Sequence, residues 1–260
     1  MKVIKIPLNA GGLSKKDGME LGPDKICEFV PNYYLKESGL LPFITTEELK
    51  VNNSNIEESS KIITEFTSKL DVPAIFLGGD HSLTYSTFKA FSKNHKNPGL
   101  LVFDAHLDCE NNFSPPSHED YLRVLIEEGH LDKNNVVLVG IRNMHTNELE
   151  YLKKKKLKVF DACEIIREGI HDTTDAVMAA VRPFDALYVS IDIDVLDPVF
   201  APGTGYIEPG GLSSRELIYF IQRLKNLKNI RMWDLVEVNP KKDVNNLTVS
   251  VAAKLVVEMC

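Results

Sequence analysis

Residues 186–197 constrain the fold of this chain more than any other stretch. The run from Ala186 to Ile191 is almost entirely apolar and predicts a buried β-strand. Three carboxylates, Asp192, Asp194 and Asp197, follow it within six residues. Side chains two residues apart on a strand project from the same face, so the first two carboxylates would lie side by side. Neighbouring buried anions repel each other and lose hydration, so we expect a cation, most simply a metal ion, to offset their charge.

Strands and helices alternate along the whole sequence, and the expected strands are apolar on both faces. This pattern is typical of an α/β fold in which helices cover both sides of a parallel sheet. We find no internal repeat, low-complexity segment or linker, and therefore predict one domain over residues 1–260. The expected strands are Lys2–Leu8, Phe43–Thr46, Ala74–Leu77, Gly99–Phe103, Val136–Ile141, Leu157–Phe160, Ala186–Ile191 and Ile230–Val238.

The composition is that of an ordinary soluble protein with an acidic balance. The formal net charge of −7 argues against general binding to nucleic acid or to an anionic membrane. No apolar run approaches the roughly 20 residues of a membrane span. The first eight residues are too short and too charged for a signal peptide. The four cysteines form no Cys-x-x-Cys pair, which indicates free thiols in a reducing compartment. We therefore expect a cytoplasmic protein.

Polar side chains gather where four of the expected strands end. Ligands of open parallel sheets bind beyond the carboxyl ends of the strands, so we expect these side chains to meet in one crevice. They are His81; Asp104, His106 and Asp108; Asp192 and Asp194; and Glu237 and Asn239.

Two imidazoles and four carboxylates are too many ligands for one tetrahedral zinc site. They suit two divalent cations with one or two bridging carboxylates, and oxygen-rich ligation favours Mn²⁺ over Zn²⁺ or Cu²⁺. Two cations about 3.5–4 Å apart can share a water and convert it to hydroxide at neutral pH, which suits hydrolysis. A single Asp-x-Asp is usually a turn, and a single histidine after a strand is usually structural. Their occurrence at three strand ends favours the metal site.

The same segments resemble the signature motifs of the ureohydrolase (arginase/agmatinase) family. The three motifs are Gly78–Ser82, Asp104–Asp108 and Ser190–Pro198. Five further segments follow the family pattern in the same order: Gly22-Pro23, Val139–Arg142, Ala201–Gly205, Glu208–Leu212 and Asp234–Pro240. The pair of segments between residues 201 and 212 resembles the agmatinase branch in particular.

The resemblance implies a three-layer α/β/α sandwich with a mostly parallel sheet and two Mn²⁺ ions per chain. It also implies a homo-oligomer, either a trimer or a hexamer. The motif positions imply that His81 and Asp108 bind one ion, that His106 and Asp194 bind the other, and that Asp104 and Asp192 bridge both. Asp197, followed by Pro198, is expected to fix a turn instead of binding metal.

The resemblance also implies the reaction. A metal-bound hydroxide would attack the guanidinium carbon of a small cationic guanidino substrate and release urea and an amine. Asp108 would pass a proton to the leaving amine, and Glu237 would hold the guanidinium through paired hydrogen bonds. His118 matches the Ser-His of agmatinases, where it would bind substrate and transfer protons. Alternatively, His118 simply begins a helix expected at His118–Glu128.

Three departures from the family pattern bear on the substrate. Tyr206-Ile207 replaces the usual Thr-Pro, so Tyr206 would contact the substrate and reshape the pocket near Glu237. Glu119 replaces the usual glycine after the histidine. The short loop Cys109–Ser117 lacks the polar pattern with which arginases hold an amino acid.

These departures argue against arginine and leave agmatine, a guanidino acid or a formimino compound open. The leading hypothesis is an agmatinase-like ureohydrolase acting in polyamine biosynthesis. The alternatives are a formiminoglutamase-like or other amidine hydrolase, an arginase, or a non-catalytic metal-binding relative. The last is disfavoured because all six expected metal ligands are intact.

Overall fold

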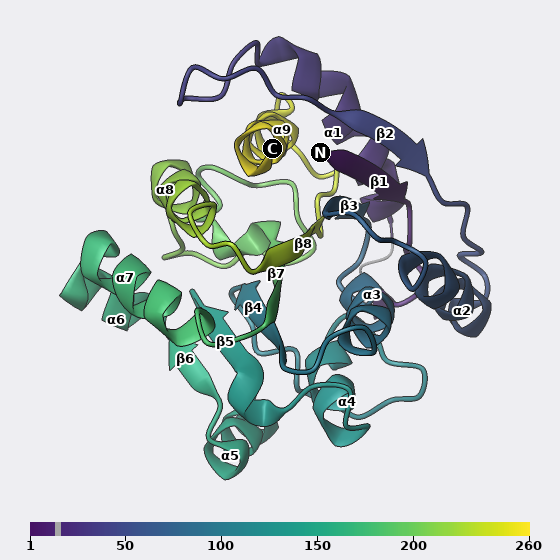
Figure 1. Cartoon of the computed structure of the whole chain (residues 1–260), viewed down its shortest axis with the longest axis vertical. Coiled ribbons are helices and arrows are strands. Elements are labelled where there is room, and N and C mark those ends of the chain that lie inside the picture. Colours follow the sequence, from purple (N-terminus) through teal and green to yellow (C-terminus); the bar gives the residue numbers. More distant parts are fainter. Residues whose placement is uncertain (14–16) are drawn as a thin grey trace.

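An eight-stranded β-sheet organises the molecule (Figure 1). The structure is a computed structural model that describes residues 1–13 and 17–260. Neighbouring strands run parallel throughout, in the order β2-β1-β3-β8-β7-β4-β5-β6. The strands are β1 (Lys2–Ile6), β2 (Thr45–Glu48), β3 (Ala74–Gly78), β4 (Pro98–Phe103), β5 (Val136–Val139), β6 (Lys158–Phe160), β7 (Ala186–Asp192) and β8 (Ile230–Val236). The predicted α/β fold with a mostly parallel sheet is confirmed.

Helices cover both faces of the sheet, because the strands carry apolar side chains on both faces (Figure 1). One face packs against α1 (Gly22–Phe29), α6 (Ala162–Glu168), α7 (Ile170–Val181), α8 (Ser214–Leu224) and α9 (Leu247–Met259). The other face packs against α2 (Ile56–Thr67), α3 (Leu83–Ser92), α4 (Tyr121–Glu127) and α5 (Thr146–Lys155). Each face has its own cluster of buried apolar residues. This arrangement is the predicted three-layer sandwich.

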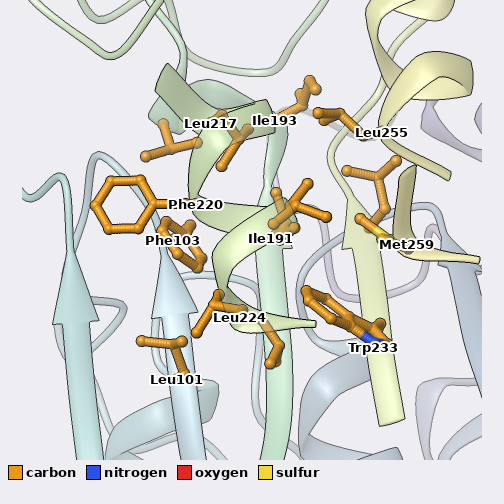
Figure 2. Packing of buried hydrophobic residues seen from close by; sticks show 14 of the residues in the cluster. Leu101, Phe103, Ile191, Ile193, Leu217, Phe220, Leu224, Trp233, Leu255 and Met259 are labelled. Carbon is orange, nitrogen blue, oxygen red and sulfur yellow. The ribbon is translucent and has the colours of Figure 1, made fainter. Parts of the chain in front are cut away.

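Helix α8 shows how the layers hold the central strands in place. Its first turn is closed by a capping box, in which Ser213 and Glu216 bond each other's backbone N–H groups. Its apolar side, including Leu224, lies over the sheet (Figure 2). The ring of Phe220 packs edge-on against that of Phe103 on β4, with centroids 5.2 Å apart. The polar residues after these strands are therefore carried by rigid elements.

The strand order brings distant parts of the sequence together. Strands β3, β8, β7 and β4 are neighbours at the centre of the sheet, although other elements separate them along the chain. Because they are parallel, their carboxyl ends lie at one edge. His81, Asp104, Asp192 and Glu237 occur at or just beyond these ends. This edge is where the expected crevice should lie.

Two element boundaries differ from the predictions near the site. The strand predicted over Ile230–Val238 ends at Val236, because Glu237 adopts a left-handed backbone conformation with a φ of 64°. The helix predicted over His118–Glu128 begins only at Tyr121. The alternative role of His118 as the first residue of that helix is therefore wrong.

Two smaller predictions also need correction. The strand expected at Phe43–Thr46 lies at Thr45–Glu48, where it forms an exposed edge of the sheet. A serine before a helix is expected to cap it, and Ser82 does precede α3, but its side chain makes no capping hydrogen bond. Its hydroxyl donates instead to the buried carboxylate of Asp80.

The structure agrees with two expectations drawn from composition. Within residues 1–13 and 17–260, none of the helices combines the length and the apolar character needed to cross a membrane. The cysteines form no disulfide, as the absence of a Cys-x-x-Cys pair predicted. The free cysteines are Cys27, Cys109, Cys163 and Cys260.

Candidate metal centre

His81 faces three carboxylates at the end of β3. Its Nδ1 atom lies 3.2 Å from Asp104 Oδ2, 3.1 Å from Asp108 Oδ2 and 3.2 Å from Asp192 Oδ2. All four side chains are almost completely buried. Asp104 and Asp108 come from the loop after β4, and Asp192 is the last residue of β7, so the parallel sheet itself brings them together.

A second cluster adjoins the first through Asp104. The Nδ1 atom of His106 lies 3.5 Å from Asp104 Oδ1 and 3.1 Å from Asp194 Oδ2. Asp104 thus turns one oxygen toward each histidine. The potential ligand atoms of His81, Asp104 and Asp192 lie within 4.8 Å of one another, as do those of Asp104, His106 and Asp194. The structure therefore places all six predicted metal ligands in two adjoining clusters.

The donor atoms of these clusters fit divalent cations. Among the residues that the structure describes, His81 Nδ1 and Asp104 Oδ2 are buried and have no hydrogen-bond partner. Buried polar atoms are normally satisfied, so such a pair at the centre of converging carboxylates requires another partner. A cation between them would both ligate these atoms and relieve the carboxylate repulsion.

The pKa values of the clustered carboxylates also favour a bound cation. Burial, followed by repulsion from Asp104, raises the pKa of Asp108 to about 8. Burial and the charges of Asp194 and Asp104 raise the pKa of Asp192 well above its usual value. Burial also opposes ionisation of Asp104, but the nearby imidazoles of His106 and His81 outweigh it and lower the pKa of Asp104. Without a cation, the site therefore retains protons on some of its carboxylates.

We expect metal binding to release these protons. Asp108 has a pKa of about 8 in the folded protein, so it is largely protonated below that pH and must lose its proton to become a ligand. Metal affinity should therefore rise as the pH increases towards 8. Calorimetric titration of Mn²⁺ into the metal-free protein, in buffers of different ionisation enthalpy, measures the proton release. An affinity that does not change between pH 6 and pH 9 would contradict this expectation.

Local turns, more than strand periodicity, orient the carboxylates. Oδ1 of Asp104 accepts a hydrogen bond from the backbone N–H of His106 at 2.7 Å, and Oδ1 of Asp192 accepts one from Asp194 at 2.8 Å. Only Asp192 lies within a strand, whereas Asp194 lies in a short 3₁₀ helix. Asp108 has a left-handed φ of 51°. The expectation that two-residue spacing acts through an extended backbone is therefore wrong, although the side chains do converge.

A buried hydrogen-bond chain behind His81 was not anticipated from the sequence. His81 Nε2 lies 2.8 Å from Ser190 Oγ, and Ser190 donates to Asp234 Oδ1 at 2.6 Å. Thr84 and Tyr188 each donate to the other oxygen of Asp234 at 2.7 Å. The signal that could have revealed it is a serine and an aspartate inside otherwise apolar central strands. Such outer partners fix the tautomer and orientation of a metal-binding imidazole.

We expect Asp234→Asn to weaken metal binding without removing any ligand. The amide cannot accept on both sides as the carboxylate does, so Ser190 and His81 lose their fixed orientation. Loss of an outer partner of this kind typically lowers metal affinity about 10- to 100-fold. A fluorescence or calorimetric metal titration checks this, and the affinity should fall while the fold is retained. Unchanged affinity would show that the chain serves packing only.

Glu237 and His118 lie together beside the metal ligands. Oε1 of Glu237 accepts a hydrogen bond from the backbone N–H of His81 at 2.8 Å and lies 3.1 Å from Nδ1 of His118. His118 is only 4% exposed, and its Nε2 atom has no hydrogen-bond partner in the described structure. Burial would lower the pKa of His118, but the charge of Glu237 outweighs it and raises the pKa to about 9. His118 can therefore carry a proton at neutral pH.

The loop after β3 reaches this position because of its glycines. A Cβ on Gly79 would lie 1.7 Å from the carbonyl oxygen of Leu8, so no other residue fits there. The carbonyl oxygen of Gly79 accepts the N–H of Glu237 at 2.7 Å. Asp80 stays outside the metal clusters and accepts the N–H of Gly11 at 2.9 Å. The glycines and Asp80 thus pack the first loops of the site closely together.

Tyr206 and Glu119 form one wall of a pocket over the clusters. The Tyr206 hydroxyl donates to Glu119 Oε1 at 2.5 Å, so two departures from the family pattern are in direct contact. The pocket has a volume of about 80 Å³. Its lining includes four of the predicted ligands and all the predicted substrate-binding residues. The lining residues are His106, Asp108, Glu110, His118, Glu119, Asn143, His145, Glu148, Asp192, Asp194, Tyr206 and Glu237.

Two polar residues near strand ends lie outside the pocket lining. Asn239 donates to the carbonyl oxygen of Asp17 at 2.7 Å and accepts the N–H of Lys241, so it fixes a loop. Asp197 accepts the N–H groups of Val199 at 3.0 Å and Gly210 at 2.7 Å. Its expected role in a turn is confirmed.

Comparison with known proteins identifies the family. The family model described as "Arginase family" matches residues 1–260. An arginase of Staphylococcus aureus (strain MRSA252) is 30% identical, over 98% of this chain and 94% of its own length. An agmatinase of Bacillus cereus is 32% identical, over 95% of this chain and 86% of its own length. The structure of formimidoylglutamase from Bacillus subtilis matches with a TM-score of 0.93 at 25% identity, covering 99% of this chain and 85% of that one.

Motifs, fold and relatives therefore agree on one assignment. The resemblance inferred from the sequence motifs is confirmed by the match to the family model over the full length. The chain belongs to the arginase family of ureohydrolases.

Proposed function

We propose that the protein hydrolyses a linear, agmatine-like guanidino compound to urea and an amine. The observation that carries this proposal is the convergence, in one pocket, of a two-cluster ligand set with Glu237 and His118. Membership of the arginase family supports hydrolysis of a guanidino C–N bond. The agmatinase among the relatives supports the particular substrate.

Two Mn²⁺ ions are the cofactors that we propose. His81 and Asp108 would hold one ion, His106 and Asp194 the other, and Asp104 and Asp192 would bridge them. Carboxylate-rich ligation with two imidazoles suits Mn²⁺. When bound, such a pair of ions supplies Lewis-acid activation of water at neutral pH.

Three residues of the chain would act on the substrate. The carboxylate of Glu237 would orient the planar guanidinium through charge-assisted hydrogen bonds. Asp108, at the edge of the pocket, would deliver a proton to the leaving amine nitrogen. His118 would move protons between the pocket and its Nε2 atom, which has no hydrogen-bond partner among the described residues, while Glu237 holds its Nδ1 atom. The ring of Tyr121 packs against that of His81, with the ring centroids 4.4 Å apart.

A formiminoglutamase-like or other amidine hydrolase is the second candidate. The similarity to the formimidoylglutamase structure favours it, as does the reshaping of the pocket by Tyr206. Against it, the lining carries several carboxylates and, among the described residues, no lysine or arginine to hold a substrate carboxylate. The absence of a lining lysine or arginine among the described residues also disfavours arginine as the substrate, because arginine carries a carboxylate as well. The intact ligand set disfavours a non-catalytic metal-binding relative.

A substrate panel tests the proposal. The Mn²⁺-loaded protein is incubated with agmatine, arginine, 4-guanidinobutyrate and formiminoglutamate, and urea or formamide is assayed. We expect urea from agmatine at the highest rate. Formamide as the main product would favour the second candidate, and no turnover of any compound would contradict an enzymatic role.

The setting of the enzyme is part of the same proposal. We infer a cytoplasmic homo-oligomer, a trimer or hexamer, that acts on a small cation in polyamine biosynthesis and binds neither nucleic acid nor membranes. The acidic net charge of −7 supports the last two points. Light scattering and cell fractionation test the assembly and the location.

A further inference from the structure

The contact between Tyr206 and Glu119 joins two segments that are 87 residues apart. We propose that this pair determines substrate specificity. It would restrict the pocket to a planar guanidinium or amidinium cation on an unbranched chain that carries no carboxylate. The inference rests on the proposed function and adds to it the residues that select the substrate.

The ring of Tyr206 occupies the space between two residues of the site. Its centroid lies 5.3 Å from that of His106, edge to face, and 6.1 Å from that of His118, nearly parallel. The remaining pocket of about 80 Å³ is well below the roughly 300–1,000 Å³ of pockets for drug-sized ligands. A slender alkyl chain fits such a space, whereas a chain branched near the pocket would collide with the aromatic ring.

Glu119 holds the ring in this position. Its Oε1 atom accepts the hydroxyl of Tyr206 at 2.5 Å and lies 3.7 Å from His118 Nε2. Its backbone carbonyl accepts the N–H of Glu110 at 3.1 Å, so its own backbone is anchored. A hydrogen bond to a charged acceptor is stronger than a neutral one, so Tyr206 is fixed as a wall and does not rotate freely.

The charges around the pocket reject a substrate carboxylate. No lysine or arginine occurs among its lining residues in the described structure. Glu110 also lines the pocket, and its buried Oε2 atom lies 4.0 Å from His145 Nδ1, with no hydrogen-bond partner among the described residues. A carboxylate on the substrate would be repelled by the carboxylates of Glu110 and Glu119, whereas an ammonium or an uncharged tail would not.

Binding of product amines tests the inference without turnover. Putrescine and ornithine differ by the same carboxylate that separates agmatine from arginine. In calorimetric titrations of the Mn²⁺-loaded protein we expect putrescine to bind at least about tenfold more tightly, since one desolvated, unpaired charge costs more than about 1.4 kcal/mol. The double variant Tyr206→Thr/Glu119→Gly should reduce this preference severalfold. The same preference in both proteins, or no binding of either amine, would overturn the inference.

Conservative variants distinguish the contribution of the Tyr206 hydroxyl from that of its ring. Tyr206→Phe and Glu119→Gln should each loosen the preference, and combining them should add little, because they break the same contact. Tyr219→Phe is the matched control: it removes a hydroxyl that lies 2.7 Å from Nδ1 of His171, outside the pocket lining, and should leave the preference unchanged. Full additivity of the two site variants would contradict a coupled pair.

A urea assay on the same samples distinguishes the two proposals. If no guanidino compound is hydrolysed while the putrescine preference depends on Tyr206 and Glu119, the proposed function fails and the specificity pair stands. If urea is released but the preference is unaffected by the double variant, only the specificity pair fails.

Discussion

We expect Asp192→Asn to lower the rate of urea release by about 100-fold or more. Loss of a residue that only orients a metal ligand already lowers metal affinity or activity about 10- to 100-fold, and loss of a ligand should cost more. Asp192 lies 3.2 Å from His81 Nδ1 in the first cluster, and it is the proposed bridge to the second. An amide lacks the negative charge that a bridging ligand shares between two cations. Metal analysis and a urea assay on the same preparation measure both losses.

The stability of this variant provides a sharper test. Burial and neighbouring charges raise the pKa of Asp192 in the folded protein. The Asp192 carboxyl therefore lowers the free energy of unfolding of the metal-free protein at any pH above its unfolded pKa, and this destabilisation grows as the pH rises. A neutral amide removes that cost. The metal-free variant should therefore melt no lower than the metal-free wild type at pH 7, while the stabilisation by Mn²⁺ disappears.

Asp197→Asn is the matched control for Asp192→Asn. Asp197 lies in the same motif, but in the described part of the chain its carboxylate accepts N–H groups of its own loop, so metal content and activity should persist. Wild-type activity and metal content in Asp192→Asn would contradict the ligand assignment. A large loss in both variants would show that the motif is sensitive to any charge change.

Glu237→Gln should lower kcat/KM by about 100-fold or more while the metal content stays at the wild-type level. The carboxylate can accept two charge-assisted hydrogen bonds from a guanidinium, each worth about 1.5–3 kcal/mol. An amide turns one donor toward the cation and removes the charge. Steady-state kinetics with the best substrate of the panel, together with metal analysis, check this expectation.

Glu258→Gln is the control for removal of a buried carboxylate. Glu258 is 3% exposed and bonds Lys254 and the N–H of Glu37, outside the lining of the pocket. Its variant should retain activity per folded molecule. If Glu237→Gln loses metal along with activity, its role is to support His81, whose N–H it accepts, and not to bind the guanidinium.

Much of the fold could be predicted from local pattern. The continuous apolar runs of β3, β4 and β7, each followed by polar residues, indicated central parallel strands with a site at their carboxyl ends. The pattern could not specify that β8 lies between β3 and β7, because strand order depends on how helices pack across the whole sheet. That order is what places Glu237 beside His81.

The metal clusters were predictable, whereas the pocket wall was not. His81, Asp104 and Asp192 have metal-binding side chains and lie at strand ends, so they could be identified from the sequence alone. The partnership of Tyr206 with Glu119 depends on the path of two loops, and no spacing rule connects them. The left-handed backbone at Asp108 and Glu237 was equally hidden, because surrounding contacts impose a conformation that these residues rarely adopt.

The dependence of urea release on bound Mn²⁺ tests the proposed hydrolase most directly. Metal-free protein is loaded with increasing equivalents of Mn²⁺, and the urea formed from agmatine is measured in each sample together with the bound metal. Activity should rise with loading and level off at two bound ions per chain. Activity that is unaffected by metal, or that is complete with one ion, would contradict a two-ion centre built from His81, His106 and their four carboxylates.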